Sequence, residues 1–92
     1  PKNALIKQYT QLMSMEGVTL TVPESAVAEI ARMALARKTG ARGLRSILED
    51  AMLEVMYEVP SNSDIKEVVL SEEAVRKEAA PVYVLHKEAM AG

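Results

Sequence analysis

An unbroken helical pattern of apolar residues through the middle of the chain is the feature that most constrains the fold. The apolar side chains recur every three or four residues, at Leu44, Ile47, Leu48, Ala51, Met52, Val55 and Met56. This spacing predicts a helix with one continuously buried face. The carboxylates Glu49, Asp50, Glu54 and Glu58 fall on the opposite face, where exposure to solvent is the simplest interpretation. In 92 residues, 49% of them hydrophobic, such a helix belongs to a single small domain whose other elements cover it.

Two further helices are predicted before this central one. The first covers residues 2–15, where Leu5, Ile6, Tyr9, Leu12 and Met13 share a face, and Gly17 suits its C-terminal end. The second begins at Pro23 and Glu24, because proline and an acidic residue both suit the first helical turn. It ends at Arg37 and Lys38, and its apolar stripe is predicted to contain Val27, Ile30, Ala31, Ala34 and Leu35.

The remaining segments predict a small sheet. Residues 18–22 alternate valine or leucine with threonine, a pattern typical of a half-buried strand. Residues 60–64 have loop composition, residues 65–70 and 82–85 read as strands, and residues 71–77 as a helical turn or short helix. We therefore predict an α+β fold with three helices and a two- or three-stranded sheet over residues 1–85, followed by a flexible tail over residues 86–92.

Catalytic and metal-binding motifs are absent from the sequence. His86 is the only histidine, there is no cysteine, and neither G-x-x-x-x-G-K-[ST] nor G-x-G-x-x-G occurs. We expect no catalytic residue, no metal site and no nucleotide hydrolysis by this chain alone. No apolar run is long enough for a membrane span, so we expect no membrane partner and an intracellular protein. The chain starts at Pro1 rather than methionine, and we expect it to be part of a longer protein.

The segment Arg-Lys-Thr-Gly-Ala-Arg-Gly-Leu-Arg, residues 37–45, is the candidate site. It joins the second and third predicted helices through a turn that contains Gly40 and Gly43. Arg42 and Arg45 follow at the helix start, where the partial positive charge of free N–H groups makes an arginine unfavourable by about 0.3–1 kcal/mol. A bound phosphate would reverse that sign. The alternative is an ordinary glycine turn with two surface arginines.

Two other functions fit a helix, a turn and a second helix. A DNA-binding helix-turn-helix has this outline, but the second helix carries acidic residues and the net charge is −2, so we expect no nucleic-acid partner. A stand-alone interaction module, binding a partner helix through an exposed apolar face, stays open.

The sequence resembles the ClpX family of AAA+ unfoldases, the ATPase subunits of the Clp protease. Residues 38–47, Lys-Thr-Gly-Ala-Arg-Gly-Leu-Arg-Ser-Ile, look like the sensor-2 segment of that family. Residues 1–9, residues 15–18 and the string Met-Tyr-Glu-Val-Pro-Ser at 56–61 agree as well. The likeness extends to about Val84. Val22 stands where an aromatic residue is common, and residues 81–85 follow no fixed family pattern.

The resemblance implies the C-terminal small domain of an ATPase module, a three-helix lid with a small sheet. Arg42 would match the sensor-2 arginine that contacts the phosphates of ATP or ADP, and Ala41 would lie beside the nucleotide. Arg45 would match a further family arginine, in contact either with the nucleotide phosphates or with another domain. Magnesium would be held mainly by the large domain, and zinc only by an N-terminal domain, both outside this chain. The implied partners are the chain's own and neighbouring large domains in a homohexamer, a ClpP-type peptidase and protein substrates. The implied compartment is the bacterial cytoplasm, with the mitochondrial matrix as the alternative.

Overall fold

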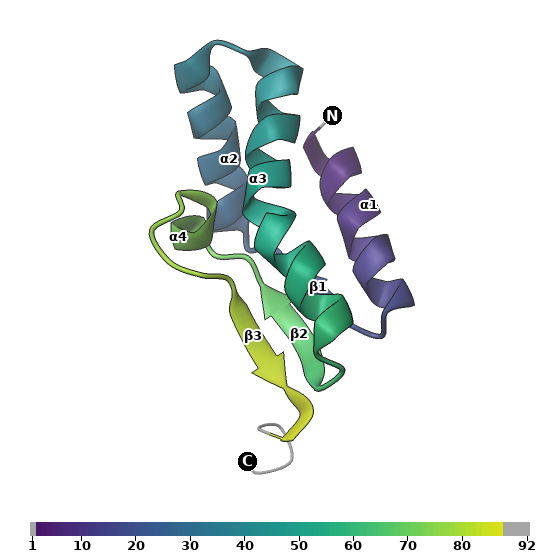
Figure 1. Ribbon diagram of the computed structural model, residues 1–92. Coiled ribbons are helices and arrows are strands. Elements are labelled where there is room, and N and C mark those ends of the chain that lie inside the picture. The colour runs from purple at the N-terminus through teal and green to yellow at the C-terminus, as the bar shows by residue number, and fades with distance from the viewer. Residues whose placement is uncertain (1, 88–92) are drawn as a thin grey trace.

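The computed structural model describes residues 2–87, which form four helices and three strands (Figure 1). In chain order these are α1 (Lys2–Met15), β1 (Thr19–Thr21), α2 (Glu24–Arg37), α3 (Gly40–Ser61), β2 (Ile65–Val69), α4 (Glu72–Val75) and β3 (Val82–Leu85). The α+β prediction is confirmed, with α4 as the short helix expected over residues 71–77. Most of the predicted tail, residues 86–92, lies outside the described residues. At its start, the backbone N–H of His86 donates to the carbonyl of Asp64.

The sheet has the order β1-β2-β3 and is mixed. β1 is parallel to β2, with Leu20 opposite Val68, and β2 is antiparallel to β3, with Val68 opposite Tyr83. Two parallel neighbours need a crossover connection, and here α2 and α3 together supply it. The helices that carry the candidate site therefore begin and end at adjacent strands of one sheet.

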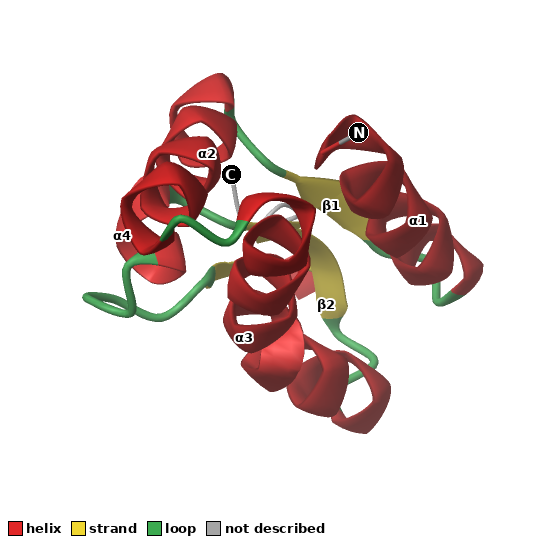
Figure 2. Ribbon diagram, turned by 90° about the horizontal axis from the view of Figure 1, so that it is seen from above, coloured by secondary structure: helices red, strands yellow, loops and turns green. Residues whose placement is uncertain are grey.

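α3 is the central element of the core, as its sequence pattern predicts. Seen from above, α1 and α2 lie on either side of α3, and α4 lies against α2 (Figure 2). Five of the predicted apolar positions of α3 are almost fully buried, namely Ile47, Leu48, Ala51, Met52 and Val55. The prediction that Met56 is buried is wrong, because 38% of its surface is exposed.

The hairpin of α2 and α3 projects beyond the rest of the domain. Its upper turns extend past α1 and α4 (Figure 1). Leu35 lies in the last turn of α2, and it was predicted to belong to the apolar stripe, but 78% of its surface is exposed. The helical period is correct there, yet no neighbouring element reaches far enough to cover the side chain.

α3 also extends past the predicted boundary at Pro60. The helix includes Pro60 and ends at Ser61. Proline removes one backbone N–H, the one that would donate to the carbonyl of Met56. In the same turn, the hydroxyl of Ser61 donates to the carbonyls of Glu58, at 3.0 Å, and Tyr57, at 3.2 Å. The loop predicted over residues 60–64 is therefore shorter, and the connection to β2 begins at Asn62.

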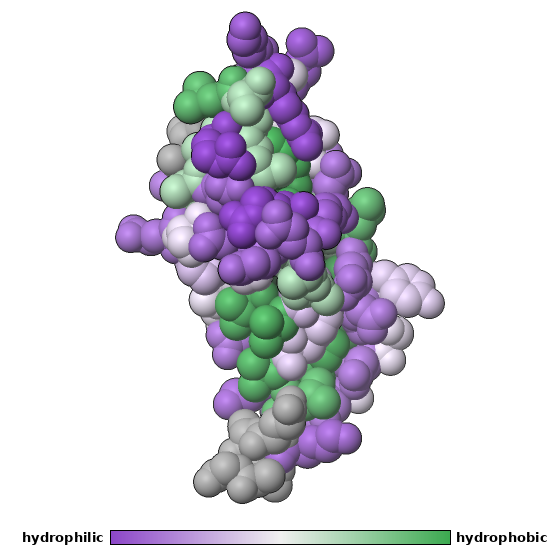
Figure 3. Space-filling model, turned by 90° about the vertical axis from the view of Figure 1, so that its left-hand side faces the viewer, coloured by the Kyte–Doolittle hydropathy of each residue, from purple (hydrophilic) through white to green (hydrophobic). Residues whose placement is uncertain are grey.

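An ionic cluster around the buried Glu29 connects α2 to the end of α4. Glu29 of α2 is only 8% exposed. It accepts two hydrogen bonds from Arg32, at 2.8 and 2.7 Å, and one at 3.3 Å from Arg76, the residue after α4. Arg76 also pairs with Glu72 at 3.3 Å and Glu78 at 3.0 Å. Hydrophilic side chains form a band across the corresponding face of the molecule (Figure 3).

The pKa of Glu29 reflects this cluster. The hydrogen bonds from Arg32 are the largest cause and lower the pKa of Glu29 from 4.5 to about 2, although burial alone would raise it. The carboxylate of Glu29 therefore stays ionised. Through Arg76, which pairs with both Glu29 and Glu72, the cluster holds α4 against α2.

Candidate functional site

The turn between α2 and α3 is closed by backbone conformation rather than by side chains. Lys38 follows the last residue of α2 in the left-handed region, with φ 56° and ψ 36°. Its N–H donates to the carbonyl of Leu35 at 3.0 Å, and the N–H of Thr39 donates to Ala34 at 3.4 Å. Gly40 has φ +60° and begins α3. A glycine was expected in the left-handed position after α2, but Lys38 occupies it. Gly40 supplies a second left-handed residue, two positions later.

Gly43 lies inside α3 and not in the turn, which corrects the predicted boundary. It is buried, and a side chain there would meet Thr39, whose Cβ lies 3.0 Å from the position of the missing Cβ. The Cβ of Ala34 on α2 lies 3.5 Å away. Gly43 therefore leaves room for the side chain of Thr39, which lies over the first turn of α3.

The start of α3 offers unpaired N–H groups to an anion. The helix has no acidic residue in its first turn, and the side chain of Thr39, at the N-cap position, forms no capping hydrogen bond. Both usual ways of satisfying the first N–H groups of a helix are therefore unused. The partial positive charge of this helix end faces solvent without a protein counter-charge from its own first turn.

Arg42 adds a full positive charge at this helix end. Its side chain is exposed, and within residues 2–87 it makes no hydrogen bond or ion pair. Ala41 beside it is exposed too. The structure thus places Arg42 where the sequence predicts it, in the first turn of α3, with nothing in the described chain that stabilises its charge.

Arg45 has a different environment, one turn further along α3. Its guanidinium lies 3.6 Å from the carboxylate of Glu49, with both side chains about half exposed. Tyr9 of α1 lies close to this pair: burial and the charge of Glu49 raise the pKa of Tyr9, whereas Arg45 lowers it. Arg45 is therefore oriented along α3 toward α1, and the structure separates the surroundings of the two arginines that the sequence placed together.

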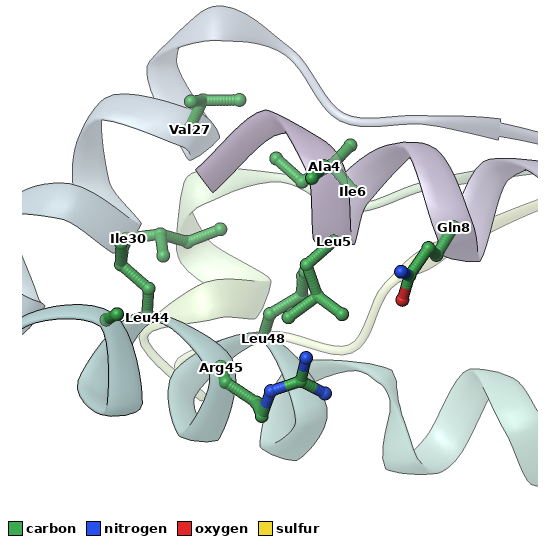
Figure 4. Close-up of a pocket in the computed structure, with 10 residues that line it drawn as sticks. Ala4, Leu5, Ile6, Gln8, Val27, Ile30, Leu44, Arg45 and Leu48 are labelled. Atoms are coloured by element: carbon green, nitrogen blue, oxygen red, sulfur yellow. The ribbon is translucent and has the colours of Figure 1, made fainter. Parts of the chain in front are cut away.

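A cavity of about 270 Å³ opens between α1, α2 and the first turns of α3. Ala41 and Arg45 line it, whereas Arg42 does not. In Figure 4, Leu5 and Gln8 extend from α1 toward α3, and Arg45 extends from α3 into the same space. The rest of the lining is mainly apolar and consists of Ala4, Ile6, Val27, Ile30, Leu44 and Leu48.

The sequence did not reveal this cavity. Leu5 and Ile30 were correctly assigned to the apolar faces of their helices, but periodicity reports only that a face is covered, not how completely. Gln8 carries no motif, and its contribution depends on how α1 crosses the start of α3. The described residues contain no group of three histidine, cysteine or acidic side chains arranged to hold a metal ion. No helix among them is long and apolar enough to cross a membrane.

The four helices around a small mixed sheet, with an arginine-bearing hairpin between two neighbouring strands, have the architecture of the small domain of an AAA+ ATPase. A comparison with family models identifies the family. The model described as the C-terminal, D2-small domain, of ClpB protein matches residues 2–75, and the chain belongs to this family of Clp AAA+ small domains. The matched range contains the whole hairpin, β2 and α4, and it ends before β3.

Proposed function

We propose that this domain is the lid of an ATP-dependent protein unfoldase of the ClpX type, and that Arg42 is its sensor-2 arginine. In this proposal Arg42 contacts the phosphates of ATP or ADP, while a large domain on the same polypeptide holds most of the nucleotide and the magnesium ion. The domain does no catalysis alone. The family match supports the Clp AAA+ level of this proposal, and the string at residues 38–47 favours ClpX within it.

One observation carries the proposal: Arg42 is exposed at an uncapped helix start and has no hydrogen bond or ion pair within residues 2–87. Such an arrangement is unfavourable for the domain alone and becomes favourable when a polyanion arrives. Guanidinium groups bind phosphate through short, charge-assisted and often bidentate hydrogen bonds. Arg42 and the free N–H groups therefore have the chemistry of a phosphate contact that is completed from outside the domain.

The other candidate residues have supporting roles in this proposal. Ala41 would lie beside the nucleotide, and its position in the first turn of α3, next to Arg42, supports this. Arg45 would contribute a second positive charge on the α1 side, where it lines the cavity. Gly40 and Gly43 set the position of Arg42, the first through its positive φ and the second by leaving room for the side chain of Thr39.

Coupling follows from the placement of Arg42 on a domain separate from the phosphates. The arginine reaches them only when the lid is docked in one orientation, so nucleotide binding shifts the population of hinge angles between the two domains. In a homohexamer, each lid also packs on the large domain of the neighbouring subunit, and a change of hinge angle moves that neighbour. We infer that protein substrates, a ClpP-type peptidase and a zinc-binding N-terminal domain act through the full-length protein, in the bacterial cytoplasm or, as the alternative, the mitochondrial matrix.

Substitution of Arg42 in the full-length protein tests the proposal. Arg42→Ala and Arg42→Lys should weaken nucleotide-dependent coupling by about 1.5–3 kcal/mol, the usual contribution of a charge-assisted hydrogen bond. The readouts are nucleotide affinity and ATP-driven unfolding of a tagged protein. Lys66→Ala, which removes an exposed positive charge from β2, is the matched control and should leave both unchanged. Full activity of both Arg42 variants would contradict the proposal, because Arg42 would then be an ordinary surface residue.

A stand-alone interaction module is the second candidate, and exposed apolar side chains favour it. Leu53 and Tyr57 of α3 are 65% and 74% exposed, and Met15 of α1 is 82% exposed. Apolar groups of this size on neighbouring helices are typical of a protein contact surface. The gene upstream of Pro1 separates the two candidates, because a lid requires a large domain with a G-x-x-x-x-G-K-[ST] motif on the same polypeptide.

A further inference from the structure

Residues 30–48, the part of the α2–α3 hairpin between Glu29 and Glu49, have a charge distribution opposite to that of the rest of the chain. They contain five of the 11 basic residues and none of the 13 acidic ones. The remaining segments hold the other six basic residues and all the acidic ones, so the overall charge of −2 conceals one strongly basic segment around the tip of the hairpin.

Within residues 30–48, the unpaired positive charge lies at the tip of the hairpin. Arg32 pairs with Glu29, and Arg45 pairs with Glu49. The other three basic side chains, those of Arg37, Lys38 and Arg42, are exposed and form no ion pair within the described residues 2–87. In Figure 3 the upper end of the molecule, where the hairpin projects, carries strongly hydrophilic side chains.

Helix stability explains only part of this arrangement. Arg37 and Lys38 complement the negative end of the α2 dipole. At the same tip, however, α3 presents its positive end with Arg42 in its first turn. The partial charges of the two helix ends have opposite signs and largely cancel, whereas the three side-chain charges are all positive and add. The tip therefore has a positive potential, and no described side chain forms an ion pair with these three residues.

We propose that Arg37 and Lys38 steer the nucleotide toward its site by long-range attraction and do not contact it once it is bound. This inference rests on the proposed function of Arg42. Lys38 lies four residues before Arg42, at most about 15 Å along the chain. The Debye length is about 8 Å at 0.15 M salt and about 30 Å at 0.01 M, so the attraction reaches an approaching magnesium–nucleoside triphosphate complex, most strongly at low salt.

The test measures association and dissociation separately in the full-length protein. Stopped-flow mixing with a fluorescent ATP analogue gives the association rate, and a chase with unlabelled ATP gives the dissociation rate. Arg37→Gln/Lys38→Gln removes two positive charges at roughly 10–15 Å from a nucleotide complex of charge about −2. Coulomb's law with screening then gives an association rate about 1.3–2 times lower at 0.15 M salt and about three to eight times lower at 0.01 M. The dissociation rate should stay unchanged, because the side chains make no contact in the bound state.

Lys66→Gln/Lys87→Gln is the matched control. It removes the same charge from two exposed residues at the opposite end of the molecule, near the start of β2 and the end of β3 (Figure 1). It should leave both rates unchanged at either salt concentration.

The outcomes separate this inference from the proposed function. An unchanged association rate in the Arg37→Gln/Lys38→Gln variant overturns steering, and so does a faster dissociation with unchanged association, which would indicate a direct contact. An equal slowing in the control variant overturns it too, because net charge alone would then be responsible. If Arg42→Ala leaves nucleotide affinity unchanged, it is the proposed function of Arg42 that fails.

Discussion

Replacing Arg42 should make the isolated domain more stable, not less. Arg42 occupies the third position of α3, three residues after the N-cap residue Thr39. An acidic residue is favoured there, because its charge complements the positive end of the helix dipole. This chain places an arginine at that position, in a first turn that lacks any acidic side chain.

The size of the effect follows from what Arg42 does not contact. It has no hydrogen bond or ion pair to lose within the described residues, so Arg42→Ala removes only the unfavourable interaction with the helix dipole, about 0.3–1 kcal/mol. Arg42→Glu reverses the charge and so replaces an unfavourable dipole interaction with a favourable one, for a gain of about 0.6–2 kcal/mol. In a domain of 92 residues, 1 kcal/mol raises the melting temperature by about 4–8 °C.

Urea unfolding followed by circular dichroism measures these differences in the isolated chain. The gain should shrink in 1 M NaCl, because salt screens the dipole interaction. Arg45→Ala is the comparison: this residue lies beyond the first turn, and its exposed pair with Glu49 contributes at most about 0.5 kcal/mol. A loss of more than about 1 kcal/mol in both Arg42 variants would refute the reasoning, since Arg42 would then be a structural residue.

Three further predictions concern the turn, the ionic cluster and the chain as a whole. Gly40→Ala should lower the free energy of unfolding by about 1–2 kcal/mol through its positive φ alone, as should Gly17→Ala, because neither Cβ would meet an atom within 4 Å; equal losses in urea unfolding confirm this, and an unchanged Gly40→Ala contradicts it. The pKa of Glu29 is lowered from 4.5 to about 2, so its ionised form stabilises the fold above pH 4.5 and that contribution is lost as the pH falls toward 2; Glu29→Gln should flatten the stability profile in this window, and a profile as steep as that of the unaltered chain would argue against the cluster. The purified chain should show no magnesium-dependent ATP hydrolysis, and measurable turnover in a clean preparation would contradict its role as a lid.

Local patterns predicted most of the secondary structure because they record which face of each element is covered. The helix over residues 2–15 and the strand over residues 82–85 have the predicted bounds. The alternating segment at residues 18–22 and the segment at 65–70 form β1 and β2, each slightly shorter than predicted. The central helix was predicted from its apolar positions alone, and five of them form the middle of the core.

The errors occur where neighbouring elements or single hydrogen bonds decide the outcome. Leu35 has the correct helical phase, but the tip of the hairpin has no neighbour to bury it. Proline is usually found at a helix boundary, yet α3 includes Pro60 and ends at Ser61, whose hydroxyl donates to two carbonyls of the last turn. Sheet order was not predictable either, because a parallel pairing of β1 and β2 depends on how two helices pack between them.

For the candidate site, the sequence identified the residues but not their surroundings. Arg42 and Arg45 were both placed at the helix start. In the structure, Arg45 pairs with Glu49 and lines the cavity beside α1, whereas Arg42 is exposed. Glu49 was assigned to a solvated face, so its pairing with Arg45 needed the side-chain positions. The role of Gly43 was equally hidden, because only the position of the Thr39 side chain shows why a side chain is excluded there.

The crossover between β1 and β2 has a mechanical consequence for the hairpin. Both of its ends are attached to neighbouring strands of the same sheet, and its two helices pack against each other. The hairpin is therefore a stiff arm clamped at its base, unlike a loop that bends on its own. A displacement at its tip is transmitted to the sheet, and a rotation of the sheet sweeps the tip through an arc that increases with the length of the arm. Whatever holds the guanidinium of Arg42 thereby fixes the orientation of the entire domain.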